Sequence, residues 1–137
     1  VKMMDRLLSE NSVDAKQLSP LTLAFIGDTV YDLLVREELI CKANRPANDL
    51  HLLAVKQVKA SAQSHAAELI LPILTEDELA VYRRGRNAKT SHIAKNATTG
   101  DYHKATGLEA LFGYLYLSGD IHRIKELFYM IKGQSDD

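Results

Sequence analysis

Acidic residues interrupt two strongly apolar stretches of this 137-residue sequence. Asp28 lies within residues 24–32, and Glu109 lies within residues 105–114. A carboxylate inside an apolar helix is costly unless it is paired or binds a cation. Two such helices must pack together in a chain of this size, so their carboxylates would repel unless a proton or a metal ion lies between them. A site built from oxygen ligands favours Mg²⁺, with Mn²⁺ as a substitute, over zinc.

Each of these acids also has a structural interpretation that the residues alone leave open. Asp28 could be half-exposed and paired with an arginine. Asp32 follows one helical turn later, on the same side of the helix. Glu109 could instead be a surface residue paired with Lys104 or Arg123.

Basic residues are concentrated between the two acidic stretches. Residues 83–95 contain five Lys or Arg and no Asp or Glu, although the formal net charge of the whole chain is −1. The global charge therefore does not indicate a nucleic-acid partner, and a local patch has to supply that indication. Lys and Arg at this density suit phosphate backbones. A solvated basic loop is the alternative.

Other catalytic and metal-binding patterns are missing from the sequence. The five histidines have no metal-ligand spacing, no His-Asp dipeptide occurs, and no P-loop, G-x-S-x-G or G-x-G-x-x-G motif is found. The single cysteine, Cys41, excludes an internal disulfide, argues against a Cys-based zinc site and fits a reducing cytoplasm. The sequence contains no stretch of 18 apolar residues, so no membrane span is predicted, and residues 1–10 lack a signal-peptide core.

The elements that must position these residues are predicted to be helical. The composition, with 46% apolar and 26% charged residues, is that of a globular protein, and the length suits a single domain over residues 1–137. No strand-like alternation of useful length appears. The fold class is therefore predicted to be all-α, with about six helices.

Capping signals set the expected helix boundaries in the first half of the chain. Ser19 followed by Pro20 predicts the start of a helix over 21–39, which is apolar on most sides and should be buried on more than one face. Asn48 is predicted to cap one long helix over 49–71. The capping-box spacing of residues 75–78 predicts a short helix that ends near residue 84.

The second half is predicted to contain a long loop and two helices. Gly85, Asn96 and Gly100 break the periodicity of residues 85–101, and structureless loops of this length in compact domains are often functional. An i, i+3, i+4, i+7 apolar stripe over 108–115 predicts the next helix. Residues 118–120 stop it, and a last helix should cover 121–132 with a frayed tail from 134 to 137.

The motifs resemble those of a known family. Residues 23–30, LAFIGDTV, resemble the signature helix of the ribonuclease III family, and residues 108–117, LEALFGYLYL, resemble its second acidic helix. Residues 83–89, RRGRNAK, look like the basic loop of the short branch called Mini-ribonuclease III. Each motif is moderately specific, but together and in order they cover residues 18 to about 132.

This resemblance implies an Mg²⁺-dependent endoribonuclease that acts as a homodimer on double-stranded RNA. It implies products with a 5′-phosphate and a short 3′ overhang, and no separate double-stranded RNA-binding domain. The implied role is maturation of the large-subunit (23S) ribosomal RNA precursor in the cytoplasm of Gram-positive bacteria, with a ribosomal protein as a candidate helper. An inactive binder of structured RNA is the alternative.

The resemblance also implies roles for individual residues. Asp28 and Glu109 stand at two of the family's four metal-binding carboxylate positions, while Ala24 and Thr106 occupy the other two. Metal binding would therefore depend more on water and RNA phosphate. Lys56 and Lys59 are candidates to extend the RNA-binding patch. The expected RNA-binding residues are Arg83, Arg84, Arg86, Asn87, Lys89 and Lys95.

Overall fold

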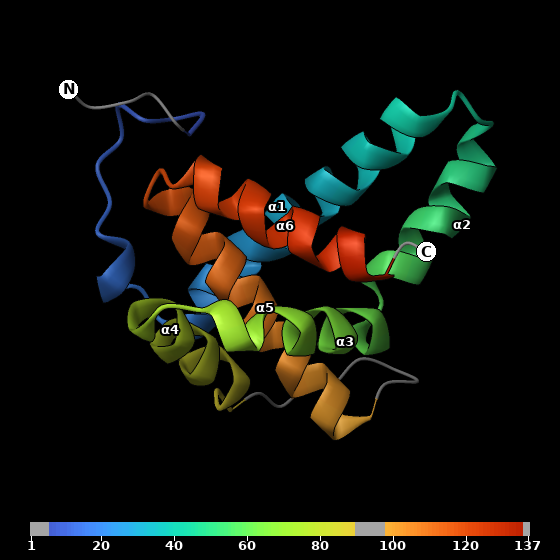
Figure 1. Cartoon of the computed structure of the whole chain (residues 1–137). Helices are drawn as coiled ribbons and strands as arrows, with labels where there is room; N and C mark the ends of the chain where they lie inside the picture. Colours follow the sequence, from blue (N-terminus) through green and yellow to red (C-terminus); the bar gives the residue numbers. More distant parts are fainter. Residues whose placement is uncertain (1–5, 90–97, 136–137) are drawn as a thin grey trace.

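The computed structural model describes residues 6–89 and 98–135, and these residues form helices and no strand (Figure 1). The all-α prediction is confirmed. In chain order the elements are η1 (Ala15–Gln17), α1 (Pro20–Lys42), α2 (Ala47–Val58), α3 (Ala60–Ile70), η2 (Leu71–Ile73), α4 (Glu76–Arg86), α5 (Thr99–Leu117) and α6 (Ile121–Ser135). None of the described helices is long and apolar enough to cross a membrane.

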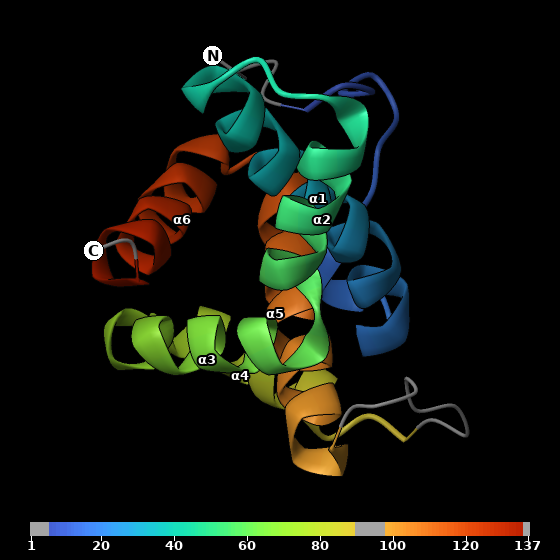
Figure 2. The ribbon, with the colours of Figure 1, turned by 90° about the vertical axis from the view of Figure 1, so that its right-hand side faces the viewer.

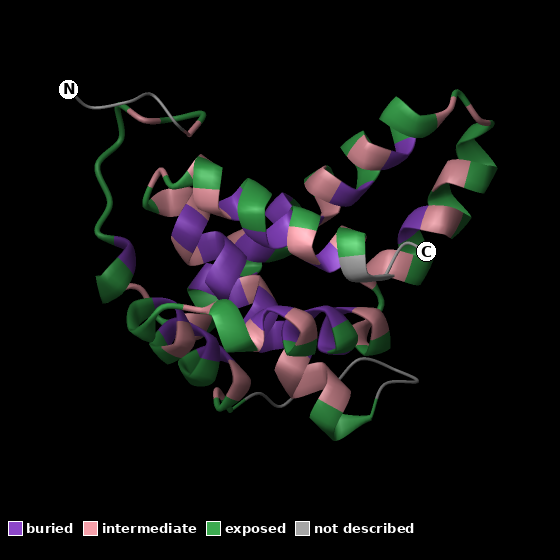
Figure 3. Cartoon of the chain, viewed as in Figure 1, coloured by how far each residue is buried: buried purple, intermediate pink, exposed green. Residues whose placement is uncertain are grey.

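The central helix is α5, which packs mainly against α1, α3 and α4 and also contacts α6 (Figures 1 and 2). Every residue from 105 to 113 is buried except Glu109, which is half-buried. Figure 3 shows the buried residues concentrated at the centre of the molecule, around α5. A helix surrounded on nearly all sides must be apolar all round, which is the reason that α5 shows no clear polar face.

Several helix ends lie where the sequence predicts them. The Ser19 side chain accepts a hydrogen bond from the Thr22 N–H at the start of α1. Thr75 and Glu78 form the predicted capping box at the start of α4, with both reciprocal bonds present. After α5, Gly119 adopts a φ of 77°, a left-handed conformation that favours glycine and lets the chain turn into α6.

The prediction of one long helix over 49–71 is wrong, because the chain leaves the helical conformation at Lys59. In a continuous helix the Val58 carbonyl would accept a hydrogen bond from the Ala62 N–H. Here the side-chain amide of Gln63 donates to that carbonyl instead, at 2.9 Å. A side chain thus replaces the lost helical bond, and α2 and α3 can take different directions (Figure 2).

Three other boundaries also differ from the prediction. Pro46, rather than Asn48, is the N-cap of α2, and it makes no side-chain capping bond. The expected loop over 85–101 is shorter, because α4 continues to Arg86 and α5 begins at Thr99. Gly85 and Gly100 are therefore helical, and packing or capping outweighs their low helix propensity. The last helix extends to Ser135, past the predicted end at residue 132.

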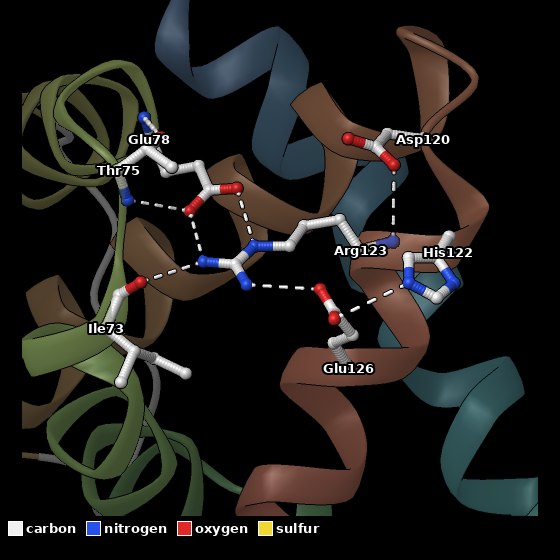
Figure 4. A network of polar contacts seen from close by, with 7 residues as sticks. All are labelled: Ile73, Thr75, Glu78, Asp120, His122, Arg123 and Glu126. Atoms are coloured by element: carbon white, nitrogen blue, oxygen red, sulfur yellow. Dashed lines mark hydrogen bonds and ion pairs between the residues drawn. The ribbon is translucent and has the colours of Figure 1, made fainter.

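A partly buried ion pair joins the start of α4 to α6 (Figure 4). Arg123 donates from Nε to Glu78 Oε2 at 2.8 Å and from Nη2 to Glu78 Oε1 at 2.9 Å. Nη2 also donates to the Ile73 carbonyl at 2.8 Å. Burial by itself would raise the pKa of Glu78, but the hydrogen bonds from Arg123 and Thr75 outweigh burial and hold that pKa below its usual range. The network fixes α6 against the η2–α4 connection.

Candidate active site

The two apolar helices that carry the predicted acids cross at a pair of glycines. A Cβ atom placed on Gly27 of α1 would lie only 1.6 Å from the Glu109 carbonyl oxygen of α5. A Cβ placed on Gly113 of α5 would lie 2.0 Å from the Leu23 carbonyl oxygen. Only residues without a side chain allow the two backbones to approach this closely.

This crossing brings the side chains of Asp28 and Glu109 together. Asp28 follows Gly27 directly and is exposed, whereas Glu109 is half-buried. The two carboxyl groups lie within hydrogen-bonding distance of each other. Burial and, after it, the negative charge of Asp28 raise the pKa of Glu109 to about 8. At neutral pH, without a cation, Glu109 is therefore mostly protonated and shares its proton with Asp28.

The structural alternatives for these acids do not hold among the described residues. Lys104 pairs with Glu68 on α3, and Arg123 pairs with Glu78, so neither forms an ion pair with Glu109. Asp28 forms no ion pair with an arginine in the described part of the chain. The neighbouring Asp32 forms such an ion pair, because its Oδ2 lies 3.0 Å from Arg36 Nε on the exposed surface.

Ala24 and Thr106 supply no further oxygen to this pair of acids. Ala24 is buried and packs in a small apolar cluster with Leu23, Val81 and Ala110. Thr106 is also buried, and its hydroxyl donates to the Tyr102 carbonyl at 3.0 Å. In the described residues, no group of three or more His, Cys, Asp or Glu side chains gathers as a metal site.

The Asp28–Glu109 pair nonetheless fits a hard divalent cation. A cation between the two carboxyl groups would take the place of the shared proton and remove the repulsion between two carboxylates. Mg²⁺ commonly keeps several water ligands and binds through one or two carboxylates together with substrate phosphate oxygens. A two-carboxylate site that is open to solvent on the Asp28 side suits this coordination.

A second close crossing packs the C-terminal turn of α4, which carries basic residues, against α5. A Cβ on Gly85 of α4 would lie 2.8 Å from the Ala110 Cβ and 3.0 Å from the Gly107 Cα, so the last turn of α4 lies directly on the segment of α5 that carries Glu109. Arg83, Arg84 and Arg86 belong to this turn. Arg86, which was expected in the loop after residue 84, therefore lies in helix α4 together with Arg83 and Arg84.

The basic residues differ in how firmly they are held. Arg83 and Lys89 are exposed. The Arg84 guanidinium donates to the Leu18 carbonyl at 3.1 Å. The Arg86 guanidinium lies 5.9 Å from the centre of the Tyr82 ring and also donates to the Asn87 side chain. Lys95, with His92, lies outside the described residues.

The other two predicted basic contacts lie at the α2–α3 junction. Lys56 is in the last turn of α2, and Lys59 is the residue at which the helix breaks. Both side chains are exposed. The Lys59 N–H still donates to the Val55 carbonyl at 3.0 Å, so Lys59 follows Lys56 by about one turn at the end of α2.

Sequence reasoning missed two features that build the site. The first is the use of glycines inside helices, Gly27 with Gly113 and Gly85 with Gly107, as crossing points. An isolated glycine within a helical pattern is the available signal for such a contact. The second is Gln63 of α3, whose side-chain amide reaches the Glu109 carboxyl. Nothing in the local pattern of α3 marks this residue.

Comparison with known proteins identifies the family. The family model of the ribonuclease III domain matches residues 21–120, which include both acids and the α4 arginines. The chain belongs to the ribonuclease III family. It is 47% identical over 110 residues to Mini-ribonuclease 3 of Thermoanaerobacter sp. (strain X514), covering 80% of this chain and 78% of the relative. It is 46% identical over 126 residues to Mini-ribonuclease 3 of Brevibacillus brevis, covering 89% and 94%.

A solved structure agrees with this assignment. A crystal structure of a Fusobacterium nucleatum protein superposes with a TM-score of 0.81 at 27% identity, covering 90% of this chain and 95% of that one. As a member of the ribonuclease III family, the present chain is an endoribonuclease. The resemblance to the short Mini branch is confirmed, since the curated relatives that match over most of the chain carry that name.

The raised pKa of Glu109 predicts a pH-dependent stability. The folded protein binds this proton more tightly than the unfolded chain, so the stabilisation is complete below the ordinary Glu pKa and is lost as pH rises towards about 8. Urea denaturation in EDTA should show a loss on the order of 2 kcal/mol between pH 5 and pH 9, less than the full shift because the carboxyl is partly open to solvent. Glu109→Gln should remove this component. Identical pH profiles for both proteins would contradict the shared proton.

Proposed function

We propose that this ribonuclease III family enzyme is an Mg²⁺-dependent endonuclease for double-stranded RNA, with Asp28 and Glu109 as its metal-binding catalytic residues. The observation that carries the proposal is the contact of these two carboxyl groups where α1 and α5 cross. When bound, Mg²⁺ lowers the pKa of a coordinated water and offsets negative charge on the scissile phosphate. Mn²⁺ is the expected substitute.

The remaining chemistry belongs to residues of the chain itself. Asp28 and Glu109 supply the negative charge that retains the cation beside the phosphate. The basic turn at the end of α4 is placed over the same segment of α5 and binds backbone phosphates on either side of the cut. Such contacts read the A-form shape of an RNA duplex more than its sequence. The proposed RNA-binding residues are Arg83, Arg84, Arg86, Asn87, Lys89 and Lys95.

A cleavage assay tests the proposal. The purified protein is incubated with a duplex RNA, with each single strand and with the DNA duplex of the same sequence, in Mg²⁺ and in EDTA. We expect the RNA duplex alone to be cut, only in Mg²⁺, leaving 5′-phosphates and short 3′ overhangs. Cleavage in EDTA would contradict the metal role, and equal cleavage of the single strands would contradict the duplex specificity. Binding without cleavage would favour an inactive RNA binder.

The natural substrate that we propose is the large-subunit (23S) ribosomal RNA precursor in the cytoplasm. The chain's similarity to Mini-ribonuclease 3 proteins supports an RNA substrate. The assay above can be repeated on an annealed precursor duplex, with and without ribosomal proteins. Stimulation by one of these proteins would identify a helper.

The salt dependence of RNA binding should reveal the basic contacts. Replacing Arg83 and Lys89, both exposed, with Ala should weaken duplex binding without changing the fold. Each lost phosphate contact should lower the slope of log K against log salt by roughly 0.7–0.9. Lys16→Ala is the control, since Lys16 is an exposed lysine paired with Asp77. An unchanged slope together with a slower single-turnover rate would instead place these residues in the reaction.

We also propose a homodimer through α1. This helix leaves Leu21, Phe25, Leu33 and Ile40 exposed, and Phe25 is 82% exposed. Large apolar side chains on one helix of a small domain indicate a protein interface. Sedimentation should show a dimer at micromolar concentration, and Phe25→Asp should shift it towards the monomer with the helical content unchanged. A wild-type monomer would refute the proposal.

A further inference from the structure

One buried polar side chain in the protein core reaches the proposed metal site from a third helix. Gln63 of α3 is only 2% exposed. Its Nε2 group donates to the Val58 carbonyl at 2.9 Å. The same side-chain amide hydrogen-bonds to the Glu109 carboxyl. The two N–H groups of one amide thus connect the α2–α3 junction to Glu109.

The oxygen of the same amide shows that this orientation has a cost. Gln63 Oε1 is buried and has no hydrogen-bond partner among the described residues. An unpaired buried acceptor destabilises the folded state by about 1–3 kcal/mol. Rotating the amide by 180° would not relieve the cost, because Oε1 would then face the Val58 carbonyl, which is an acceptor, and Glu109 would lose the amide donor that lowers its pKa. Only the observed orientation presents hydrogen-bond donors to both groups.

Filling the space between α3 and α5 does not by itself require a glutamine at this position. An apolar side chain of similar length would fill the same space between α3 and α5 without leaving a buried oxygen unpaired. The contact that it would lose, besides the one at Val58, is the one that directs the Glu109 carboxyl. The metal-ligand side chains of proteins are commonly oriented by such outer hydrogen bonds.

We propose that Gln63 is a positioning residue that holds the Glu109 carboxylate in the orientation needed for the divalent cation. This inference rests on the proposed metal role of Glu109. It adds a third helix to the site. Helix α1 supplies Asp28, and α5 supplies Glu109. Helix α3 orients Glu109 through the side-chain amide of Gln63, which also bonds to Val58 at the α2–α3 junction.

The test compares Gln63→Met, which keeps the length of the side chain, with Ser64→Ala as the matched control. Ser64 is buried on the same helix, and no hydrogen bond ties it to Glu109. Two quantities are measured: the rise of Tm with Mg²⁺ in the absence of RNA, and the Mg²⁺ concentration for half-maximal cleavage. For Gln63→Met we expect a smaller rise in Tm and an approximately 10-fold higher Mg²⁺ requirement, with a smaller change in the maximal rate.

The possible outcomes separate this inference from the proposed function. Ser64→Ala should keep the wild-type response to Mg²⁺. A Gln63→Met protein that has a lower Tm but also keeps the wild-type response to Mg²⁺ would show a structural role and overturn the inference alone. A wild-type protein that neither binds Mg²⁺ nor cuts RNA would overturn the proposed function and this inference with it.

A second measurement needs no variant and applies even if Gln63→Met fails to fold. The side-chain amide ¹⁵N–¹H signals of Gln63 in the wild-type protein should shift during an Mg²⁺ titration, with the same midpoint as the rise in Tm. The side-chain amide of Gln57, which accepts a hydrogen bond from Lys132 away from the site, is the internal reference. Gln63 signals that stay unmoved while Mg²⁺ binds would overturn the inference.

Discussion

Asp28→Asn is expected to abolish RNA cleavage while the protein stays folded and still binds duplex RNA. The substitution keeps the shape of the side chain but removes the charge that retains the cation beside Glu109. Metal ions contribute several kcal/mol of charge stabilisation to phosphoryl transition states, so the rate should fall by about 10³-fold or more. Glu109→Gln should have the same effect on the rate. Single-turnover cleavage at saturating Mg²⁺ measures both.

Asp32→Asn provides the matched control. Asp32 lies one turn after Asp28 on the same helix, but it pairs with Arg36 on the surface rather than with Glu109. An exposed ion pair of this kind contributes at most about 1 kcal/mol to stability. This variant should therefore cut at the wild-type rate. If Asp28→Asn or Glu109→Gln keeps more than about a tenth of the wild-type rate, the metal role of that residue is wrong.

The second large effect is expected at the crossing of α1 and α5. Gly27→Ala introduces a Cβ where the structure leaves only 1.6 Å to the Glu109 carbonyl oxygen, a backbone atom that cannot turn aside. The two helices must move apart and lose packing along their contact. Overpacking of a core costs about 1–3 kcal/mol and occasionally more, and this site should lie at the upper end. Urea denaturation, followed by circular dichroism, measures the loss.

The same substitution should also reduce the response to Mg²⁺, because moving α1 away from α5 separates Asp28 from Glu109. Gly133→Ala is the control for glycine replacement in a helix. A Cβ on Gly133 of α6 meets no atom within 4 Å, so alanine should stabilise the protein there by about 0.5–1 kcal/mol. If the free energy of unfolding of the Gly27→Ala protein lies within 1 kcal/mol of the wild-type value, the crossing tolerates a wider separation.

Much of the architecture follows from local sequence signals. The apolar periodicity and the absence of strand-like alternation indicate an all-α fold, and the side chains of Ser19 and Thr75 mark helix starts that the structure confirms. These signals succeed because a capping hydrogen bond needs only residues three positions apart. The two acids are also visible in the sequence, since a charge within an apolar stretch stands out wherever the chain folds.

The sequence failed where a distant contact determines the local structure. The break at Lys59 is stabilised by the bond from Gln63 to Val58 and is accompanied by the contact of Gln63 with α5. Gly85 was expected to end a helix, yet α4 continues through it because the missing Cβ lets α4 pack on Gly107. Helix propensities of about 1 kcal/mol for glycine are smaller than the packing energy of such a crossing.

The sequence by itself determined that Asp28 and Glu109 are acidic residues within apolar helical stretches, because that property depends only on residue type and neighbours in the chain. Only the tertiary structure decided that the two carboxyl groups share one site, that Lys104 and Arg123 pair elsewhere, and that Gln63 reaches the same site. The physical reason is that these facts depend on how closely α1, α3 and α5 approach. For α1 and α5 that distance is set by Gly27 and Gly113, and an isolated glycine in a sequence does not tell which other helix will pack against it.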